Sequence, residues 1–349
     1  MPPTPLPTLL SSSELSYLHT SLSLSPPIRP DARSPTSFRP LVAETDLLPT
    51  ANGSARLCFA DGTEAIVGVK AEVERTGVVG KKVDLRDSGV EEDIEMGDGD
   101  DKTVGSGKVG GEDRWLEVTV DIPGQRDDDA MVVFLGQMIF EGLVADGEFR
   151  GRLVVNERWH WRVFVDILLL SAPLTYPLPL LSLTTHLALL STHLPAPVAG
   201  LGKDDDPLFN DDWDAAFPLY PSAYSKSRAK ASIARPPITL LVISVGDNIF
   251  FDPSHAELAV ADAVIAVTIA SSTSENRNDG ELSLLAIRTI DPPSRLSSLA
   301  AEVGQAGEDG AWKPKKGGMS RSVLRKMVGM CVEKGGVGQE VLGGLEGFT

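Results

Sequence analysis

The stretch from Glu157 to Leu190 carries the strongest apolar pattern of the chain. From Trp161 to Leu170 it is dense in Val, Ile, Leu and Phe around Asp166, which is typical of a strand buried on both faces. Prolines up to residue 179 then exclude both strand pairing and a continuing helix. The leucines after them are spaced as in a buried helix. The pattern predicts a strand, a loop and a helix, a unit whose loop often contacts a ligand at the carboxyl end of the strand.

Residues 44 to 73 have the pattern of an antiparallel β-meander, in which β-formers are separated by turns at Asn52-Gly53-Ser54 and Asp61-Gly62. A strand over 115–122 and a helix over 131–144 are predicted to follow. The apolar stripe of this helix is formed by Val132, Leu135, Ile139 and Leu143. Residues 150 to 170 are predicted to form two strands joined by a turn near Asn156.

The N-terminal region predicts one short helix. Ser11 and Glu14 have the spacing of a capping box, and the helix should end before Pro26. Its apolar side is expected to hold Leu15, Tyr17, Leu18 and Leu22.

The last third of the chain repeats the order of strands followed by a helix. A hairpin around Gly246-Asp247-Asn248, strand-like stretches at 259–272 and 281–290, and a helix over 321–342 are predicted. This favours an α+β fold built by internal duplication of one unit. The expected division is an N-terminal arm 1–27, a first half 28–200, a linker 201–236 and a second half 237–349.

The linker contains a patch of aromatic residues followed by basic ones. The aromatics are Phe209, Trp213, Phe217, Tyr220 and Tyr224, and the basic residues are Lys226, Arg228 and Lys230. Such a mixture can bind nucleic acid. We favour a linker whose aromatics cover an apolar surface.

Composition and charge set limits on this picture. A chain of 349 residues can form one large or two modest domains, and its net charge of −17 opposes direct binding of polyphosphates. The charge is uneven, because residues 84–101 contain nine acids against the single Arg86. With the glycine-rich residues that follow, this predicts a disordered acidic insertion over about residues 80–113. The alternative is a docking segment for a basic partner.

Several classes of site are not supported by the residues. Cys58 and Cys331 are too few for a disulfide framework and are expected to be reduced. The five histidines lack companions at metal-ligand spacing, so we expect no metal and no cofactor. The N-terminus lacks the basic and apolar regions of a signal peptide, and Asp166 and the prolines argue against a membrane span at 163–190. We expect a soluble protein.

Several blocks of the sequence are similar to motifs of one known family. Arg29-Pro30-Asp31-Ala32-Arg33 resembles the R-x-D-G-R opening of the RNase PH family, with Ala32 in place of the usual glycine, and Phe38-Arg39 matches its aromatic–Arg pair. Residues 44–73 resemble its first meander, and residues 251–257 its D-P-T-x-E-E-E run. The blocks span most of residues 28–335. The chain resembles this family, and more closely the non-catalytic ring subunits of the eukaryotic RNA exosome core.

The resemblance implies a duplicated RNase PH-type β-α unit, like domain 2 of ribosomal protein S5. Active members of the family let inorganic phosphate attack the last phosphodiester of an RNA 3′ end. They carry a Gly-Gly-Thr-Arg loop, where this chain has Leu174 for the Thr and Thr175 for the Arg. They also carry two aspartates six residues apart, where this chain has Asp252 and then Leu258. A lone carboxylate is an incomplete acid–base device, so the resemblance implies a degenerate site with no catalytic residue.

The helix over 131–144 departs from the family as well. RNA-binding ring members offer arginines from it, where this chain has Leu135, Ile139 and Gly142. For Arg29, Arg33 and Arg39 two roles remain open. They could contact RNA near the pore of the ring, or they could brace the N-terminal arm through local ion pairs, which we favour.

The expected function is that of a structural, catalytically inactive subunit of the hexameric exosome ring, supporting 3′-to-5′ processing and degradation of RNA, including rRNA maturation and mRNA turnover. The implied partners are other RNase PH-type ring subunits, RNA-binding cap subunits and RNA reached through the complex, but no membrane. The implied locations are nucleus, nucleolus and cytoplasm. The alternatives are an active phosphate-dependent exoribonuclease with Asp252 as its acid, and a free-standing module that binds a basic protein through the acidic insertion.

Overall fold

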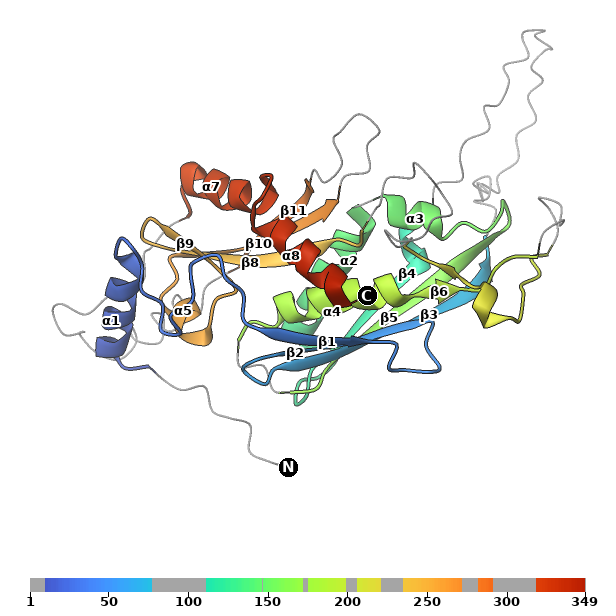
Figure 1. The fold of residues 1–349 in the computed structure, drawn as a ribbon, viewed down its shortest axis with the longest axis horizontal. Helices are drawn as coiled ribbons and strands as arrows, with labels where there is room; N and C mark the ends of the chain where they lie inside the picture. Colours follow the sequence, from blue (N-terminus) through green and yellow to red (C-terminus); the bar gives the residue numbers. More distant parts are fainter. Residues whose placement is uncertain are drawn as a thin grey trace, which may run out of the picture.

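The described residues form two large β-sheets, with helices packed between and over them, and a small two-stranded sheet (Figure 1). The computed structural model describes residues 10–76, 111–145, 147–171, 175–198, 206–220, 235–271, 282–290 and 318–348. The mixture of sheets and helices confirms the predicted α+β class. The acidic insertion, Leu174, and the basic residues of the linker lie outside the described residues.

The first sheet has the strand order β1-β2-β3-β5-β4. Its strands are β1 (Leu41–Thr45), β2 (Gly53–Phe59), β3 (Glu64–Arg75), β4 (Leu116–Asp121) and β5 (Trp159–Leu169). All neighbours pair antiparallel except β4 and β5, which are parallel. Buried and more exposed residues alternate along the first half of β3, so that one face of the sheet carries the core. The predicted meander is confirmed, although its first strand begins at Leu41.

The second sheet has the order β11-β10-β8-β9 and is antiparallel throughout. Its strands are β8 (Ile238–Val245), β9 (Asn248–Phe251), β10 (Ala263–Ser271) and β11 (Leu282–Ile290). The hairpin around Gly246 is confirmed. Every residue of β8 is buried, because helices cover both faces of this sheet.

The helix α4 (Leu178–Ser191) lies between the two sheets (Figure 1). It packs on β2 and β3 of the first sheet and on β8 of the second, and all fourteen of its residues are buried. Its polar side chains tolerate this burial because they are hydrogen-bonded, as the hydroxyls of Thr184 and Thr185 are to the carbonyl oxygens of Leu180 and Leu181. The strand, loop and helix predicted for residues 157–190 are therefore confirmed as the centre of the fold.

The remaining helices surround this centre. They are α1 (Ser12–Ser23), α2 (Ala130–Ala145), α3 (Glu148–Arg152), α5 (His255–Ala259), α7 (Arg321–Val332) and α8 (Val337–Leu345). The short elements are β6 (His193–Leu194), β7 (Phe217–Pro218), and 3-10 turns at Asp113–Trp115, Trp213–Ala215 and Glu346–Phe348. The capping box of α1 and the buried stripe of α2 are confirmed. Within the described residues, no helix combines the length and apolar character that a membrane span needs.

Four local predictions are wrong. Residues 150–152, predicted as the start of a strand, belong to α3, because Phe149 and Leu153 are buried at helical spacing. The predicted helix 321–342 is two helices, since Gly335 has a φ of +73° and the chain turns there. The side chain of Tyr17 is 72% exposed instead of packed. Trp213 is also 53% exposed, whereas Tyr220 is buried as the linker prediction requires.

Candidate functional site

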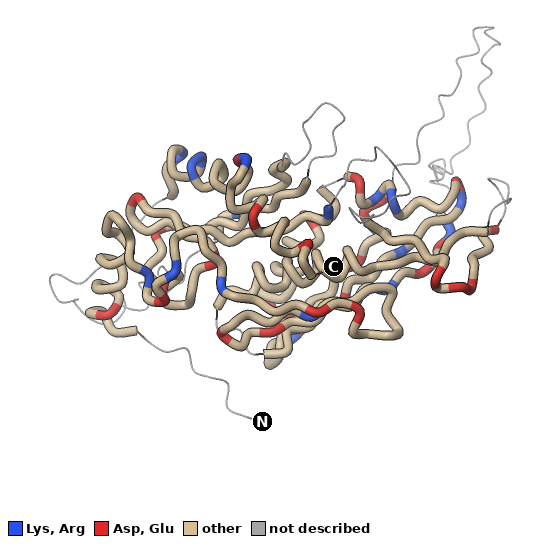
Figure 2. Tube along the Cα trace, viewed as in Figure 1, with Lys and Arg blue, Asp and Glu red and all other residues tan. Residues whose placement is uncertain are grey.

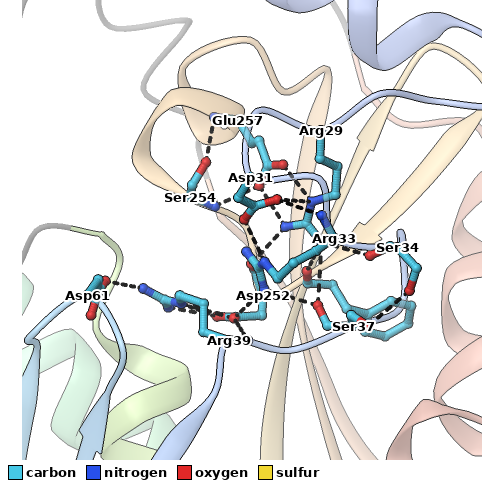
Figure 3. Close-up of polar contacts among 11 residues, drawn as sticks. Arg29, Asp31, Arg33, Ser34, Ser37, Arg39, Asp61, Asp252, Ser254 and Glu257 are labelled. Atoms are coloured by element: carbon cyan, nitrogen blue, oxygen red, sulfur yellow. Dashed lines mark hydrogen bonds and ion pairs between the residues drawn. The ribbon is translucent and has the colours of Figure 1, made fainter.

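The matched residues of the family motif meet where the segment 28–39 crosses the second sheet (Figure 3). This segment follows α1 and leads into β1, and the N–H of Phe251 at the end of β9 donates to the carbonyl oxygen of Pro35 at 2.9 Å. The chain then turns at Asp252 and enters α5 through a Ser254–Glu257 capping box. Arginines from the segment therefore face acids from the β9–α5 turn.

The innermost contact joins Arg29 to Glu257. The Nε of Arg29 lies 2.7 Å from Oε1 of Glu257, and Nη2 lies 2.8 Å from Oε2, which is the fork geometry of a strong bidentate pair. Both side chains are fully buried. The same guanidinium donates to the carbonyl oxygens of Phe251 and Asp252, at 3.3 and 3.1 Å. The buried charges are thus paired and hydrogen-bonded, as burial demands.

Asp252 is occupied on both carboxylate oxygens. Oδ2 accepts from Nη1 of Arg33 at 2.9 Å and from the backbone N–H of Arg39 at 2.8 Å, while Oδ1 accepts from Nη2 of Arg39 at 2.7 Å. The Asp252 side chain is fully buried. Burial disfavours the charged form of Arg39, but the contacts with Asp252 and Asp61 together outweigh it and raise the pKa of the guanidinium. Asp252 therefore acts here as an anchor for two arginines.

The network also reaches the first sheet. The guanidinium of Arg39 contacts Asp61 in the β2–β3 turn and lies 4.4 Å from the ring centroid of Phe59 at the end of β2. Arg39 thereby links Asp61 of one sheet to Asp252 of the other, as Figure 3 shows. Ala32, at the family's glycine position, has a φ of +57°, a conformation that costs roughly 1–3 kcal/mol for a residue with a side chain. The contacts of the neighbouring arginines hold it there.

Leu258 and Thr175, which the resemblance matches to positions of a phosphorolytic site, and the nearby Asp262 have other surroundings. Leu258 is buried in a small apolar cluster with Leu22 and Phe250. Oδ2 of Asp262 accepts the N–H of Gly246 at 2.7 Å, and so supports the β8–β9 turn. Thr175 is half-buried before α4, and no hydrogen bond or ion pair of the described residues links it to Asp252. Across the described part of the chain, no three His, Cys, Asp or Glu residues are grouped to hold a metal ion.

The bracing hypothesis for the three arginines is supported by these contacts, which combine a local ion pair between Arg33 and Asp31, at 2.5 Å, with ion pairs to distant acids. Arg29 pairs with an acid 228 residues away, and Arg39 with one 213 residues away. A bound phosphate needs a cation that is not already neutralised, and each of these arginines faces a carboxylate. RNA contact by Arg29, Arg33 and Arg39 stays a prediction.

An open hollow of about 560 Å³ lies apart from this network. It is formed by the β1–β2 loop, the end of α4 and the turn at Trp213. Its charged side chains are the acids Asp46 and Asp214, so its walls repel phosphate.

The described histidines have structural surroundings. His186 in α4 is 1% exposed, and its Nδ1 donates to the carbonyl oxygen of Pro236 at 2.8 Å. His160 stacks on Trp115 with ring centroids 4.0 Å apart. Both cysteines are free, as expected, and burial raises the pKa of the Cys331 thiol to about 12.

His186 should make the stability of the fold depend on pH. Burial lowers its pKa from 6.5 to about 4, so folding favours the neutral ring. Its contribution is full above pH 6.5 and is lost as the pH falls towards 4, by about 3 kcal/mol. We expect His186→Gln, which keeps a donor for Pro236, to lose that part of the acid dependence. Denaturant unfolding of both chains from pH 7 to 4 tests this, and parallel curves would contradict it.

Comparison with known proteins gives relatives and structures of one kind. No family model matches the chain. It is 31% identical over 254 residues to exosome complex component RRP42 of Saccharomyces cerevisiae, covering 72% of this chain and 78% of that protein. It is 28% identical over 276 residues to exosome complex component rrp42 of Schizosaccharomyces pombe, covering 75% and 79%.

Two solved structures share the fold. A chain of an archaeal exosome core aligns with a TM-score of 0.54 and 17% identity over 96% of both chains. A chain of the Archaeoglobus fulgidus exosome with RNA bound to the active site aligns with a TM-score of 0.52 and 17% identity, over 90% of this chain and 92% of that one. These alignments confirm the RNase PH-like fold expected from the sequence.

Proposed function

The chain belongs to the family of RRP42-type exosome components, subunits of the RNA exosome ring, and from this premise we propose that its work in the ring is structural. It would carry no phosphorolytic site of its own. The observation that carries this proposal is the state of Asp252, whose two carboxylate oxygens are both taken up by arginines of the same chain. A general acid or metal ligand needs an oxygen that can reach the substrate or the ion.

The neighbouring positions support the same proposal. Thr175 stands where active members have an arginine, so the cation that would hold the attacking phosphate is missing. Leu258 stands for the second aspartate and is 4% exposed within an apolar cluster. Recovering the site would require a buried leucine to be exchanged for an acid and a salt-bridged aspartate to be released.

The proposal extends to partners and location. The subunit would hold ring neighbours and RNA-binding cap subunits in place, and would meet RNA through the assembled complex. Its processing role would include rRNA maturation in the nucleus and nucleolus and mRNA turnover in the cytoplasm. We also propose that the chain is divided into an arm 1–27, a first half 28–200, a linker 201–236 and a second half 237–349. The segment 28–39 of the first half forms ion pairs with residues of the second half.

A phosphorolysis assay tests the catalytic part. We expect the purified full chain, given single-stranded RNA, Mg²⁺ and inorganic phosphate, to release nucleoside diphosphate at least about 100-fold more slowly than an active RNase PH enzyme. The released nucleotide is measured by chromatography. Release at a comparable rate, abolished by Asp252→Asn, would overturn the proposal.

Co-purification tests the structural part and separates it from the free-standing module. A tagged chain should recover RNase PH-type ring subunits and cap proteins at moderate salt. The same chain with residues 84–101 deleted should recover them equally well. Loss of all partners on this deletion would favour the module that binds through the acidic insertion.

A further inference from the structure

The outer face of α7 carries three basic residues that have no acidic partner among the described residues. Arg321, Arg325 and Lys326 are exposed, and none of them forms an ion pair with any described residue. Elsewhere on the described surface, cations are commonly neutralised, as Arg162 is by Glu117 at 3.0 Å. Figure 2 shows the basic positions gathered along α7 at the upper edge of the molecule. In a chain of net charge −17, this face is an exception.

The charge of Arg321 opposes the dipole of α7. The N-terminal end of a helix carries partial positive charge, which favours acids in the first turn. In α7 the first turn contains no acid, and Arg321 is its first residue. From residue 311 to residue 332 the sequence contains six cations and no acid at all. Arg321 therefore gains no stabilisation from the dipole, and no described acid pairs with the three cations, which leaves them available to an external anion.

The surface lacks the anchors of a protein interface. Such interfaces depend on a few buried aromatic or large apolar side chains surrounded by a polar rim. Among the described residues from 318 to 347, no large hydrophobic side chain is exposed, because those of α7 turn towards β10 and β11. The polar groups that remain outside include Ser320 and Ser322, whose hydroxyls can donate to phosphate oxygens. Binding to a nucleic-acid backbone needs cations and donors, and no apolar anchor.

We infer that the outer face of α7 binds the phosphate backbone of RNA without sequence preference. Arg321 and Arg325 lie one helical turn apart, and Lys326 follows directly, so that the three cations can meet neighbouring phosphates of one strand. This face is separate from the Asp252 network and shares no residue with it. The inference rests on the proposed function, because the exosome supplies the RNA.

The test uses the full chain and a fluorescent single-stranded RNA of mixed sequence. The variant Arg321→Gln/Arg325→Gln/Lys326→Gln should bind at least about tenfold more weakly at low salt, as measured by anisotropy. For single strands, each phosphate contact contributes about −0.7 to the slope of log K against log salt. Loss of three contacts should therefore make this slope shallower by about 2. The variant Arg321→Lys/Arg325→Lys keeps the charge and should bind like the parent.

The matched control removes the same charge from other exposed sites. Lys70→Gln/Arg114→Gln/Arg126→Gln has the same net charge as the test variant, and its three side chains are 62%, 63% and 82% exposed. It should bind RNA like the parent, and circular dichroism should show that both variants fold. Equal weakening in control and test variants would overturn the site, because net charge alone would then explain it.

Two further outcomes are decisive. Competition by polyglutamate as strong as that by unlabelled RNA would reassign the face to acidic proteins and overturn the inference.

Co-purification of ring subunits with the test variant distinguishes the two proposals. Intact co-purification with lost RNA binding supports the site. If the parent chain recovers no ring subunits, the proposed function fails, while the titration still decides whether α7 binds RNA.

Discussion

Replacing Glu257 with glutamine is expected to lower the free energy of unfolding by about 3–5 kcal/mol. Glutamine has nearly the same shape, but it removes the charge that neutralises the fully buried Arg29. An uncompensated charge in the interior is far more costly than the loss of the pair as a whole. The same substitution weakens the capping box of α5, where Glu257 accepts the N–H of Ser254 at 2.7 Å. Chemical denaturation of the purified chain measures the change.

The control is an ion pair of similar chemistry on the surface. Asp128 lies 3.1 Å from Arg126, and their side chains are 72% and 82% exposed. Asp128→Asn should cost less than about 1 kcal/mol. The double variant Arg29→Met/Glu257→Leu should cost less than the two single variants together, since it leaves no unpaired buried charge. Strict additivity, or a cost for Glu257→Gln as small as that of Asp128→Asn, would show that the pair is not essential to the fold.

Local patterns account for the elements that the sequence predicted correctly. The burial of β5 and α4 is visible as two adjacent apolar runs separated by prolines, and the alternation along β3 is visible as a two-residue period. Both the apolar runs and the two-residue period are formed by residues that are close together in the sequence. The sequence was therefore sufficient to place the central strand, loop and helix.

Competing local signals explain the elements that were missed. The stretch 148–152 holds arginines and a glycine, and only the four-residue spacing of Phe149 and Leu153 indicated α3. The signal for α5 was present, because Ser254 and Glu257 have the spacing of a capping box.

The partners of the three arginines could not be found from the chain alone. No short-range pattern relates Arg29 to Glu257 or Arg39 to Asp252, because the pairs form only when β9 and α5 are placed beside the segment 28–39. The sequence predicted only local ion pairs for these arginines, such as the one between Arg33 and Asp31. The fold determines which distant acids pair with these arginines, and it makes Asp252 part of a brace between the two sheets.

Asp252→Asn is the second substitution with a large expected effect, of about 3–5 kcal/mol in the free energy of unfolding. It keeps the size of the side chain and, like aspartate, asparagine tolerates the φ of +46° at this position. What it removes is the charge shared by Arg33 and Arg39, whose side chains are 13% and 10% exposed. A carboxylate kept for catalysis would behave differently, since active sites are commonly held at a cost in stability. Thermal and chemical unfolding of the parent and the variant measure the change.

Limited proteolysis distinguishes release of the brace from general weakening of the fold. Trypsin cleaves after Lys and Arg but not before proline, and the only such residues in the first 39 are Arg29, Arg33 and Arg39. Arg29 and Arg39 precede prolines, so only the bond after Arg33 can be cut. Asp252→Asn should release the fragment 1–33 several times faster than the parent under native conditions, because the segment then opens locally. Equal rates of release, together with unchanged stability, would mean that Asp252 does not hold the segment, and would return this carboxylate to the list of possible catalytic acids.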